Sequence, residues 1–273
     1  LYSTTNYNEA QEVLDLCLKT IEESNYYYNT YFKGTKWDDA FYQLVYYQAV
    51  GTANVTQMQI FKSLSDFYAS QKSSLANTYY DLVQKCVAYD KELTSYYNNT
   101  MSNKKWNKMM SSSHVGFVTW NSTGWKYPTG TQVTLEENAK MIVSVDGDSK
   151  GYQTGKATLP TFTNTQKQRY CVTMSNAGQK EYDFTVEAKE DWIQITDKRG
   201  EKAISGGTVA DAEYFYVAID WSKVTADASG TILVKGTNAT VEITIKADYT
   251  KYKDKGVNTH IESNDVVTID AAE

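Results

Sequence analysis

Residues 105–120 read KWNKMMSSSHVGFVTW. Two tryptophans, a Met-Met pair, a glycine and one of the two histidines of the chain fall within this short segment. An ordinary surface loop is instead rich in Ser, Asn, Asp and Gly. The segment also divides the chain, because apolar residues repeat with a helical period before it and with a strand period after it. It therefore predicts a multidomain protein that is helical first and β second.

Residues 1–112 predict an antiparallel helical bundle. Ala10, Leu14 and Cys17 follow the i, i+4, i+7 spacing that forms one apolar stripe on a helix. Gly51 stands where a second helix would stop. Four helices joined by short connections are expected, at about residues 8–21, 38–51, 55–70 and 74–98.

Residues 131–249 predict an immunoglobulin-like β-sandwich. Apolar and polar residues alternate there, as in strands with one buried face. Turn signals such as Asp146-Gly147 and Ser229-Gly230 separate these runs at the spacing of an antiparallel sandwich. Six strands are expected, at about residues 141–146, 182–186, 192–196, 214–219, 232–234 and 241–245. The strand order over residues 131–180 stays open.

Two shorter segments complete the predicted organisation. Residues 113–130 form a junction between the helical and β parts. Residues 250–273 are a linker followed by the start of a further β domain, with its first strand near Val266–Ile269. The chain begins with leucine and without a basic and then apolar signal segment, so we expect an internal fragment of a longer precursor.

The charge pattern excludes several classes of partner. The net charge is −6, and Arg169 and Arg199 are the only arginines. Binding a phosphate backbone needs a basic face, so nucleic acid is not an expected partner. Arginine is also the usual clamp for a planar carboxylate, which argues against a uronate clamp within this chain. No apolar run approaches the roughly 20 residues that span a bilayer, so no membrane partner is expected.

Six runs of sequence carry a family resemblance. The first, residues 105–120, is similar to the KWN, MM, His and Trp pattern that ends the helical region of glycoside hydrolase family 115, the xylan α-glucuronidases. Four others resemble the accessory sandwich of that family, and they are residues 191–195 (DWIQI), 217–223 (VAIDWSK), 230–236 (GTILVKG) and 241–245 (VEITI). The last, residues 262–273, resembles the entry to the family's final β domain. Residues 121–124 depart from the Gln and Pro residues usual in the family, which puts a shared contact from this loop in doubt.

The resemblance implies a parent enzyme that removes glucuronic acid or its 4-O-methyl form from glucuronoxylan by inverting hydrolysis. The family's catalytic carboxylates lie in a (β/α)₈ barrel before the helical region, so this chain is expected to be a non-catalytic accessory region, inactive by itself. The implied partners are that barrel, a C-terminal β domain of the same protein, and glucuronoxylan through the parent; a homodimer stays open. The implied location is exported, whether periplasmic, cell-surface or extracellular.

Candidate contacts with substrate or with another domain lie around the junction, and they are His114, Trp106, Trp120, Trp125 and Tyr127. Histidine titrates near neutral pH and acts as an acid or a base in many sites. The sequence gives His114 no partner, so a hydrogen-bonding or purely structural role is the alternative. Aromatic rings match the apolar faces of sugars, although core or interface packing is their commoner use. The same choice applies to the 23 tyrosines, most of which lie at helical spacing that favours packing.

No catalytic residue, metal or cofactor is predicted. Cys17, Cys86 and Cys171 form no CxxC pair and have no nearby histidine, which argues against zinc. Two alternatives remain for Cys17 and Cys86: buried free thiols, or a disulfide between them. Adjacent carboxylates such as Asp38 and Asp39 diverge around a helix and cannot form the separated pair that glycoside hydrolysis needs, so we interpret them as solvated surface groups.

Two hypotheses from other classes remain beside the accessory region. One is a free-standing carbohydrate-binding or surface adhesion module, with Trp125 and neighbouring tyrosines on an exposed platform. The other is a surface scaffold without sugar contact.

Overall fold

The computed structural model describes residues 9–112, 115, 126–250, 257–261 and 267–271. The chain divides into two compact units. The helical unit contains Leu1–Ala69 and Ala76–Val133, and the sandwich unit contains Ser70–Leu75 and Thr134–Glu273. His114, Trp120 and Trp125 lie outside the described residues.

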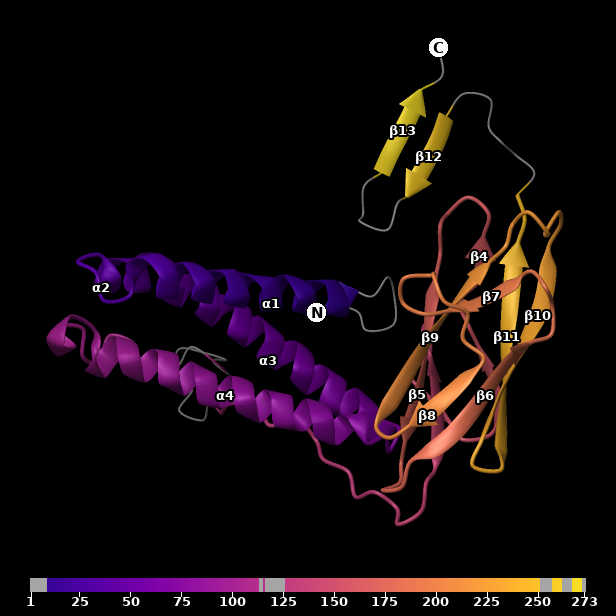
Figure 1. The fold of residues 1–273 in the computed structure, drawn as a ribbon, viewed down its shortest axis with the longest axis horizontal. Helices are drawn as coiled ribbons and strands as arrows, with labels where there is room; N and C mark the ends of the chain where they lie inside the picture. Colours follow the sequence, from indigo (N-terminus) through magenta and orange to yellow (C-terminus); the bar gives the residue numbers. More distant parts are fainter. Residues whose placement is uncertain (1–8, 113–114, 116–125, 251–256, 262–266, 272–273) are drawn as a thin grey trace. The chain divides into compact units, whose positions relative to one another are not determined.

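The helical unit is built from long helices that continue into short π-helical or 3₁₀ segments (Figure 1). In chain order the segments are α1 (Glu9–Tyr27), η1 (Tyr28–Phe32), α2 (Asp38–Phe41), η2 (Tyr42–Tyr46), α3 (Tyr47–Ser70), α4 (Leu75–Asn99) and η3 (Met101–Lys104). In the described part of the chain, no helix is both long and apolar enough to cross a membrane.

The expected second and third helices are one continuous helical stretch. α2, η2 and α3 follow one another without a break from Asp38 to Ser70, so the described part of the unit has three long helical stretches instead of the four expected. Gly51 lies inside α3 and does not end it. Glycine costs a helix interior only about 1 kcal/mol relative to alanine. Burial of Val50, Ala53 and Asn54 on either side of Gly51 outweighs that cost.

α3 and α4 run antiparallel and are joined by hydrogen bonds along their length (Figure 1). The Asn54 side-chain amide donates to the Cys86 carbonyl at 2.9 Å, and the Ser65 hydroxyl donates to the Ala76 carbonyl at 3.1 Å. The side chains of Asn54 and Ser65 are buried, so these bonds satisfy groups that would otherwise cost about 1–3 kcal/mol each.

Buried tyrosines form much of the core near η1 and η2. Tyr28, Tyr42, Tyr46 and Tyr97 pack with aliphatic residues in one cluster. Their hydroxyls are hydrogen-bonded, as burial requires: Tyr28 donates to Asp38 at 2.7 Å, and Tyr46 donates to the Asn25 side chain at 2.6 Å. For these residues the packing interpretation of the tyrosine pattern is confirmed.

The sandwich unit contains two sheets and a separate hairpin (Figure 1). One sheet has the order β2-β1-β5-β9-β7, and its strands are β1 (Met141–Val145), β2 (Gly151–Tyr152), β5 (Tyr170–Asn176), β7 (Ile193–Thr196) and β9 (Ala212–Ile219). The other has the order β3-β11-β10-β6-β8, with β4 also paired to β11, and its strands are β3 (Gly155–Thr158), β4 (Phe162–Thr163), β6 (Tyr182–Ala188), β8 (Gly206–Val209), β10 (Ala228–Gly236) and β11 (Ala239–Asp248).

The six expected strands are all present, as β1, β6, β7, β9, β10 and β11. Most pairs are antiparallel, but β3 and β4 pair in parallel with β11. β12 (Val257–Ile261) and β13 (Val267–Ala271) form an antiparallel hairpin with each other, in the segment where one strand was expected.

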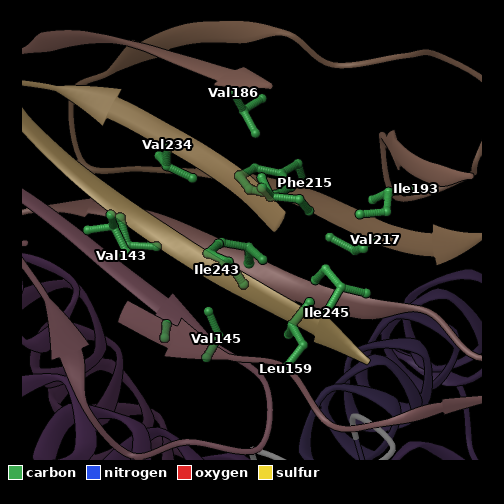
Figure 2. Close-up of a cluster of buried hydrophobic side chains, with 14 of the residues drawn as sticks. Val143, Val145, Leu159, Val186, Ile193, Phe215, Val217, Val234, Ile243 and Ile245 are labelled. Carbon is green, nitrogen blue, oxygen red and sulfur yellow. The ribbon is translucent and has the colours of Figure 1, made fainter. Parts of the chain in front are cut away.

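The space between the two sheets is filled mainly by aliphatic side chains, together with aromatic residues that include Phe162, Phe184 and Phe215. Figure 2 shows Val143 and Val145 of β1, Phe215 of β9, and Ile243 and Ile245 of β11 directed into the same cluster. All five are 0–4% exposed. Alternate residues of each strand reach this core, which is the period-2 pattern expected from the sequence.

The opposite face of β1 and β5 is covered by residues 71–74, which connect α3 to α4. The Ser144 hydroxyl donates to the Gln71 side-chain oxygen at 2.6 Å, and Ser73 donates to Ser175 at 2.7 Å. The Ser74 N–H donates to the Asn176 carbonyl at 2.7 Å. These small polar groups are buried and hydrogen-bonded, so β5 is buried on both faces and carries Thr, Ser and Asn among its apolar residues. Val172 and Met174 alternate with Thr173 and Ser175, so the period-2 pattern of β5 was present in the sequence although this strand was not expected.

The continuous helix generates a test at Gly51. Nothing lies within 4 Å of a methyl group added there, so Gly51→Ala is expected to stabilise the helical unit by about 0.5–1 kcal/mol in urea unfolding. Gly34 is a matched control, because its surroundings are equally open but its φ is +74°. Gly34→Ala is expected to destabilise by about 1–2 kcal/mol. A destabilising Gly51→Ala would contradict an uninterrupted α3.

Candidate functional site

Residues 102–104 have a strained backbone immediately before the Trp106 segment. Ser102, Asn103 and Lys104 have φ values of 49°, 54° and 67°, a left-handed conformation that non-glycine residues seldom adopt. The Asp39 carboxylate holds this turn by accepting the Ser102 N–H at 3.0 Å and the Ser102 hydroxyl at 2.8 Å. Asp39 is therefore a structural group and is half-buried, which corrects the solvated interpretation.

Trp106 packs on the tyrosine core of the helical unit. Its ring is half-buried against that cluster, with the Lys105 ammonium 4.8 Å from the ring centroid. The backbone around it is tied to the end of α4, since the Met110 N–H donates to the Asn98 side chain at 2.9 Å and the Asn107 amide donates to the Asn98 carbonyl at 3.3 Å. The position of Trp106 therefore comes from packing and hydrogen bonds within the helical unit.

Tyr127 is bound to a buried carboxylate. Its hydroxyl donates to Asp90 at 2.7 Å, and the Asp90 side chain is only 3% exposed. Burial, together with the hydrogen bond to Asp90, raises the pKa of Tyr127 well above its ordinary value. The Lys91 ammonium lies 5.3 Å from the Tyr127 ring centroid. Tyr127 therefore stays protonated at neutral pH and serves as a hydrogen-bond donor.

Side chains of α3 and α4 hold every second residue after Tyr127. The Gln84 amide donates to the Thr129 carbonyl at 3.2 Å. Asn77 accepts the Val133 N–H at 2.8 Å and donates to the Val133 carbonyl at 3.0 Å. Ser65 accepts the N–H of the intervening Thr131 at 2.9 Å. We call residues 127–133 the clamped segment, because four of its residues are bound to the two helices.

Asp90 is the site residue that sequence reasoning missed. It lies on the stripe of α4 that includes the buried residues Val83, Val87, Leu93 and Tyr97. A carboxylate at helical spacing among apolar residues is rarely left unpaired, because burying an uncompensated charge is expensive. The position of Asp90 on this apolar stripe was therefore the sequence feature that could have identified it as a paired, buried carboxylate.

Tyr127 and Trp106 pack in two different clusters of the helical unit, and only Tyr127 lies near Val115 of the junction. Val115 is buried with Met58 and Val83, and Tyr127 packs against the same cluster. Trp106 belongs to the separate tyrosine cluster. The predicted site residues that can be compared, Trp106 and Tyr127, therefore lie in two places and make no single site.

Three of the four family-like runs of the sandwich meet at one corner. The Asp220 N–H donates to the Trp192 carbonyl at 2.8 Å, and the Thr231 N–H donates to the Glu190 carboxylate at 2.7 Å. A methyl group added at Gly230 would lie 2.7–2.8 Å from side-chain atoms of Glu190, Ile193 and Trp192, so a larger residue there would force these side chains to shift. Glu190 is thus a hydrogen-bonding structural group. We call Glu190, Trp192, Ile193, Asp220, Gly230 and Thr231 together the Trp192 corner.

A separate group of aromatic side chains is exposed at the end of α1. Tyr26, Tyr27 and Tyr31 are 57%, 51% and 56% exposed. Their ring centroids lie 5.5–6.2 Å apart, so the three rings support one another in solvent. Such exposed rings offer apolar faces to a ligand. The tyrosine pattern therefore contains an exposed minority beside the packed residues.

The thiols and acidic groups supply no metal centre in the part of the chain that the structure describes. There, no group of three or more His, Cys, Asp or Glu side chains is placed to hold a metal ion. The three cysteines are free, so a Cys17–Cys86 bridge is not formed. Burial raises the pKa of Cys86 to about 11, which keeps this thiol protonated and unreactive at neutral pH.

No protein-family model and no curated protein matches the chain. A GH5 xyloglucanase from Bacteroides ovatus, solved with a XXXG heptasaccharide, is similar over 40% of this chain and 19% of its own, with 13% identity and a TM-score of 0.26. The PapD-like domain of human CEP192 is similar over 41% of this chain and 87% of its own, with 10% identity and a TM-score of 0.27. The Caenorhabditis elegans MSP-domain-like protein SSP-19 is similar over 32% of this chain and 92% of its own, with 9% identity and a TM-score of 0.25. Likenesses at these scores carry no argument about fold or activity.

The bond between Tyr127 and Asp90 generates a double-mutant test. Tyr127→Phe and Asp90→Asn are each expected to destabilise the helical unit, because each disrupts a charge-assisted bond to a buried group. In urea unfolding, the double variant should lose about 1–3 kcal/mol less than the sum of the single losses. Thr129→Ala is the control, since Gln84 binds only the main chain there, and it should change stability by less than about 0.5 kcal/mol. Strict additivity would contradict a direct interaction.

Proposed function

We propose that this chain is the non-catalytic accessory region of an exported xylan α-glucuronidase similar to glycoside hydrolase family 115. The parent removes glucuronic acid or its 4-O-methyl form from glucuronoxylan by inverting hydrolysis. The catalytic carboxylates belong to a barrel elsewhere in that protein. This region supplies the helical support and the accessory sandwich.

The Trp192 corner is the observation that carries the proposal. Residues 191–195, 217–223 and 230–236 are three of the runs that resemble the family, and they are far apart in sequence. Their contacts through Trp192, Asp220 and Gly230 make them one packing unit. Three runs that resemble the family therefore form one structural unit of the sandwich, and this supports the proposal.

The Trp106 segment gives the helical unit a role in the proposal. Residues 105–110 are held to α4 by Asn98 and packed on the tyrosine core, while Lys105, Lys108 and Met109 are exposed. Such a segment is rigid in position and open at its surface, as a bracing contact requires. In the proposal it supports the catalytic barrel, and it carries no catalytic group.

The β-sandwich is immunoglobulin-like in this proposal. Two mainly antiparallel sheets enclose one aliphatic core, and Trp192 is buried at its edge. The resemblance to an immunoglobulin domain is limited to the two-sheet architecture, because the parallel pairing of β3 and β4 with β11 departs from an antiparallel sandwich. The sandwich separates or docks the C-terminal β domain, and a homodimer through it stays part of the proposal.

Hydrolysis of glucuronoxylan by the full-length protein tests the proposal. Release of (4-O-methyl)glucuronic acid with inverted anomeric configuration is expected by proton NMR, whereas residues 1–273 alone should release none. Trp106→Ala should lower kcat/KM or the unfolding midpoint of the full-length protein, because its ring anchors the bracing segment. Lys85→Ala, at an exposed position of α4 in the same unit, is the control. The proposal fails if the full-length protein releases no uronic acid, and the bracing role fails if Trp106→Ala changes neither quantity.

The exposed tyrosines favour a second candidate, a carbohydrate-binding or adhesion module. Tyr26, Tyr27 and Tyr31 give a platform of aromatic faces, and Trp37 is 59% exposed nearby in sequence. Pyranose rings present apolar C–H faces that pack on such rings. This candidate needs no catalytic domain.

Affinity electrophoresis in glucuronoxylan gels separates the two candidates. If the binding-module candidate holds, residues 1–273 are retarded, and Tyr27→Ala combined with Tyr31→Ala abolishes the retardation by removing the platform. Trp125→Ala tests the loop predicted from sequence in the same way. Leu44→Ala is the control, since Leu44 is also exposed but has no ring to stack. Equal mobility with and without the polysaccharide would reject the module.

A further inference from the structure

Two turns at one end of the helical unit are held by adjacent aspartates at the start of α2. Asp38 accepts the Gly34 N–H at 2.6 Å and the Tyr28 hydroxyl at 2.7 Å. Asp39 accepts the Ser102 N–H at 3.0 Å. Both aspartates are half-buried. The loop between η1 and α2 therefore lies beside the turn that follows α4, and Figure 1 shows α2 and the last part of α4 at the same end of the unit.

Each of these turns presents a lysine beside an aromatic ring. The Lys36 ammonium lies 5.1 Å from the Trp37 ring centroid, and the Lys105 ammonium lies 4.8 Å from the Trp106 ring centroid. An aromatic face attracts a cation, which limits the positions that a flexible lysine side chain takes. The two ammonium groups are therefore held at the surface in advance of any binding, and less conformational entropy is lost when a ligand arrives.

Positive charge gathers at this end, although the whole chain has a net charge of −6. Residues 26–42 and 96–110 contain five lysines and two acidic residues, and the acidic residues are the two aspartates that hold the turns. All five lysines are exposed, and within the described ranges none of them forms a salt bridge. We call these five residues the lysine group, and they are Lys33, Lys36, Lys104, Lys105 and Lys108.

Separate cations accompanied by exposed rings fit a polymer whose negative charges are spaced apart. Trp37 and Tyr31 are 59% and 56% exposed at this end. The apolar faces of sugars pack on such rings, and a carboxylate on a nearby sugar attracts an ammonium group. Lysine supplies a point charge and needs no fixed carboxylate geometry, so this contact is not the arginine clamp that the sequence excludes. The negative charge of the rest of the chain opposes nucleic acid, which carries a charge at every nucleotide.

We propose that the lysine group and Trp37 bind an acidic polysaccharide, by attraction between ammonium and carboxylate groups added to stacking on the exposed rings. The proposal rests on the second candidate function, the carbohydrate-binding module, and names the class of polysaccharide that this module takes. It is separate from the bracing role of residues 105–110. The affinity then has one part that salt weakens, from the lysines, and one part that salt leaves unchanged, from the rings.

Calorimetric titration of residues 1–273 with two forms of one polymer tests the proposal. Glucuronoxylan is compared with the same polymer after its uronic acids are reduced to neutral sugars, which removes the charge and keeps the backbone. At about 50 mM salt the dissociation constant should be about tenfold lower for the acidic form, and this difference should shrink at about 500 mM salt. Lys36→Gln combined with Lys105→Gln should weaken binding of the acidic form about fivefold and leave that of the neutral form within about twofold.

The control is Lys85→Gln combined with Lys246→Gln, which removes the same charge from exposed positions of α4 and β11. It should change neither dissociation constant by more than about twofold. Urea unfolding of both double variants shows that the fold is retained, as expected for exposed side chains.

Four results would overturn the proposal. An equal loss of affinity in the control would show that the charge acts without a local site. Equal affinity for the two polymers would leave the binding module as an uncharged platform, whereas no binding of either polymer would reject the module as well. Tighter binding of single-stranded DNA or of phosphatidylserine vesicles than of glucuronoxylan would assign the lysine group to another class of partner.

Discussion

The pairing of α3 with α4 is the interaction on which the helical unit depends. Both helices place polar side chains on their inner faces, and each such group needs a hydrogen bond once water is excluded. Asn54 and Ser65 find carbonyls on α4, while Asn77 and Asp90 bind the clamped segment. The inner polar groups therefore determine which part of the chain lies against the helices.

The same requirement shapes the sandwich unit. Gln71 and Ser73 precede α4, yet they satisfy Ser144 and Ser175 on the outer face of a sheet far along the chain. An isolated strand containing buried Ser and Thr would be unstable without such partners. The short loop between two helices is therefore also a structural part of the sandwich.

The two functional proposals rest on different observations. The glucuronidase proposal depends on the Trp192 corner and on the Trp106 segment, which the sequence identified through the family resemblance. The binding-module candidate depends on the exposed rings of Tyr26, Tyr27 and Tyr31, which became distinguishable from the packed tyrosines only through their exposure.

The sequence alone determined the change from helix to sheet near residue 112 and six strands of the sandwich, because hydrophobic periodicity reports which face of an element is buried. Helix continuity at Gly51 depended on burial of its neighbours, and the buried Ser144 and Ser175 depended on a covering loop distant in sequence. Asp90 became a site residue only when folding placed Tyr127 beside it. Periodicity carries no information about such distant partners, so only the tertiary structure decided where the buried polar groups are satisfied.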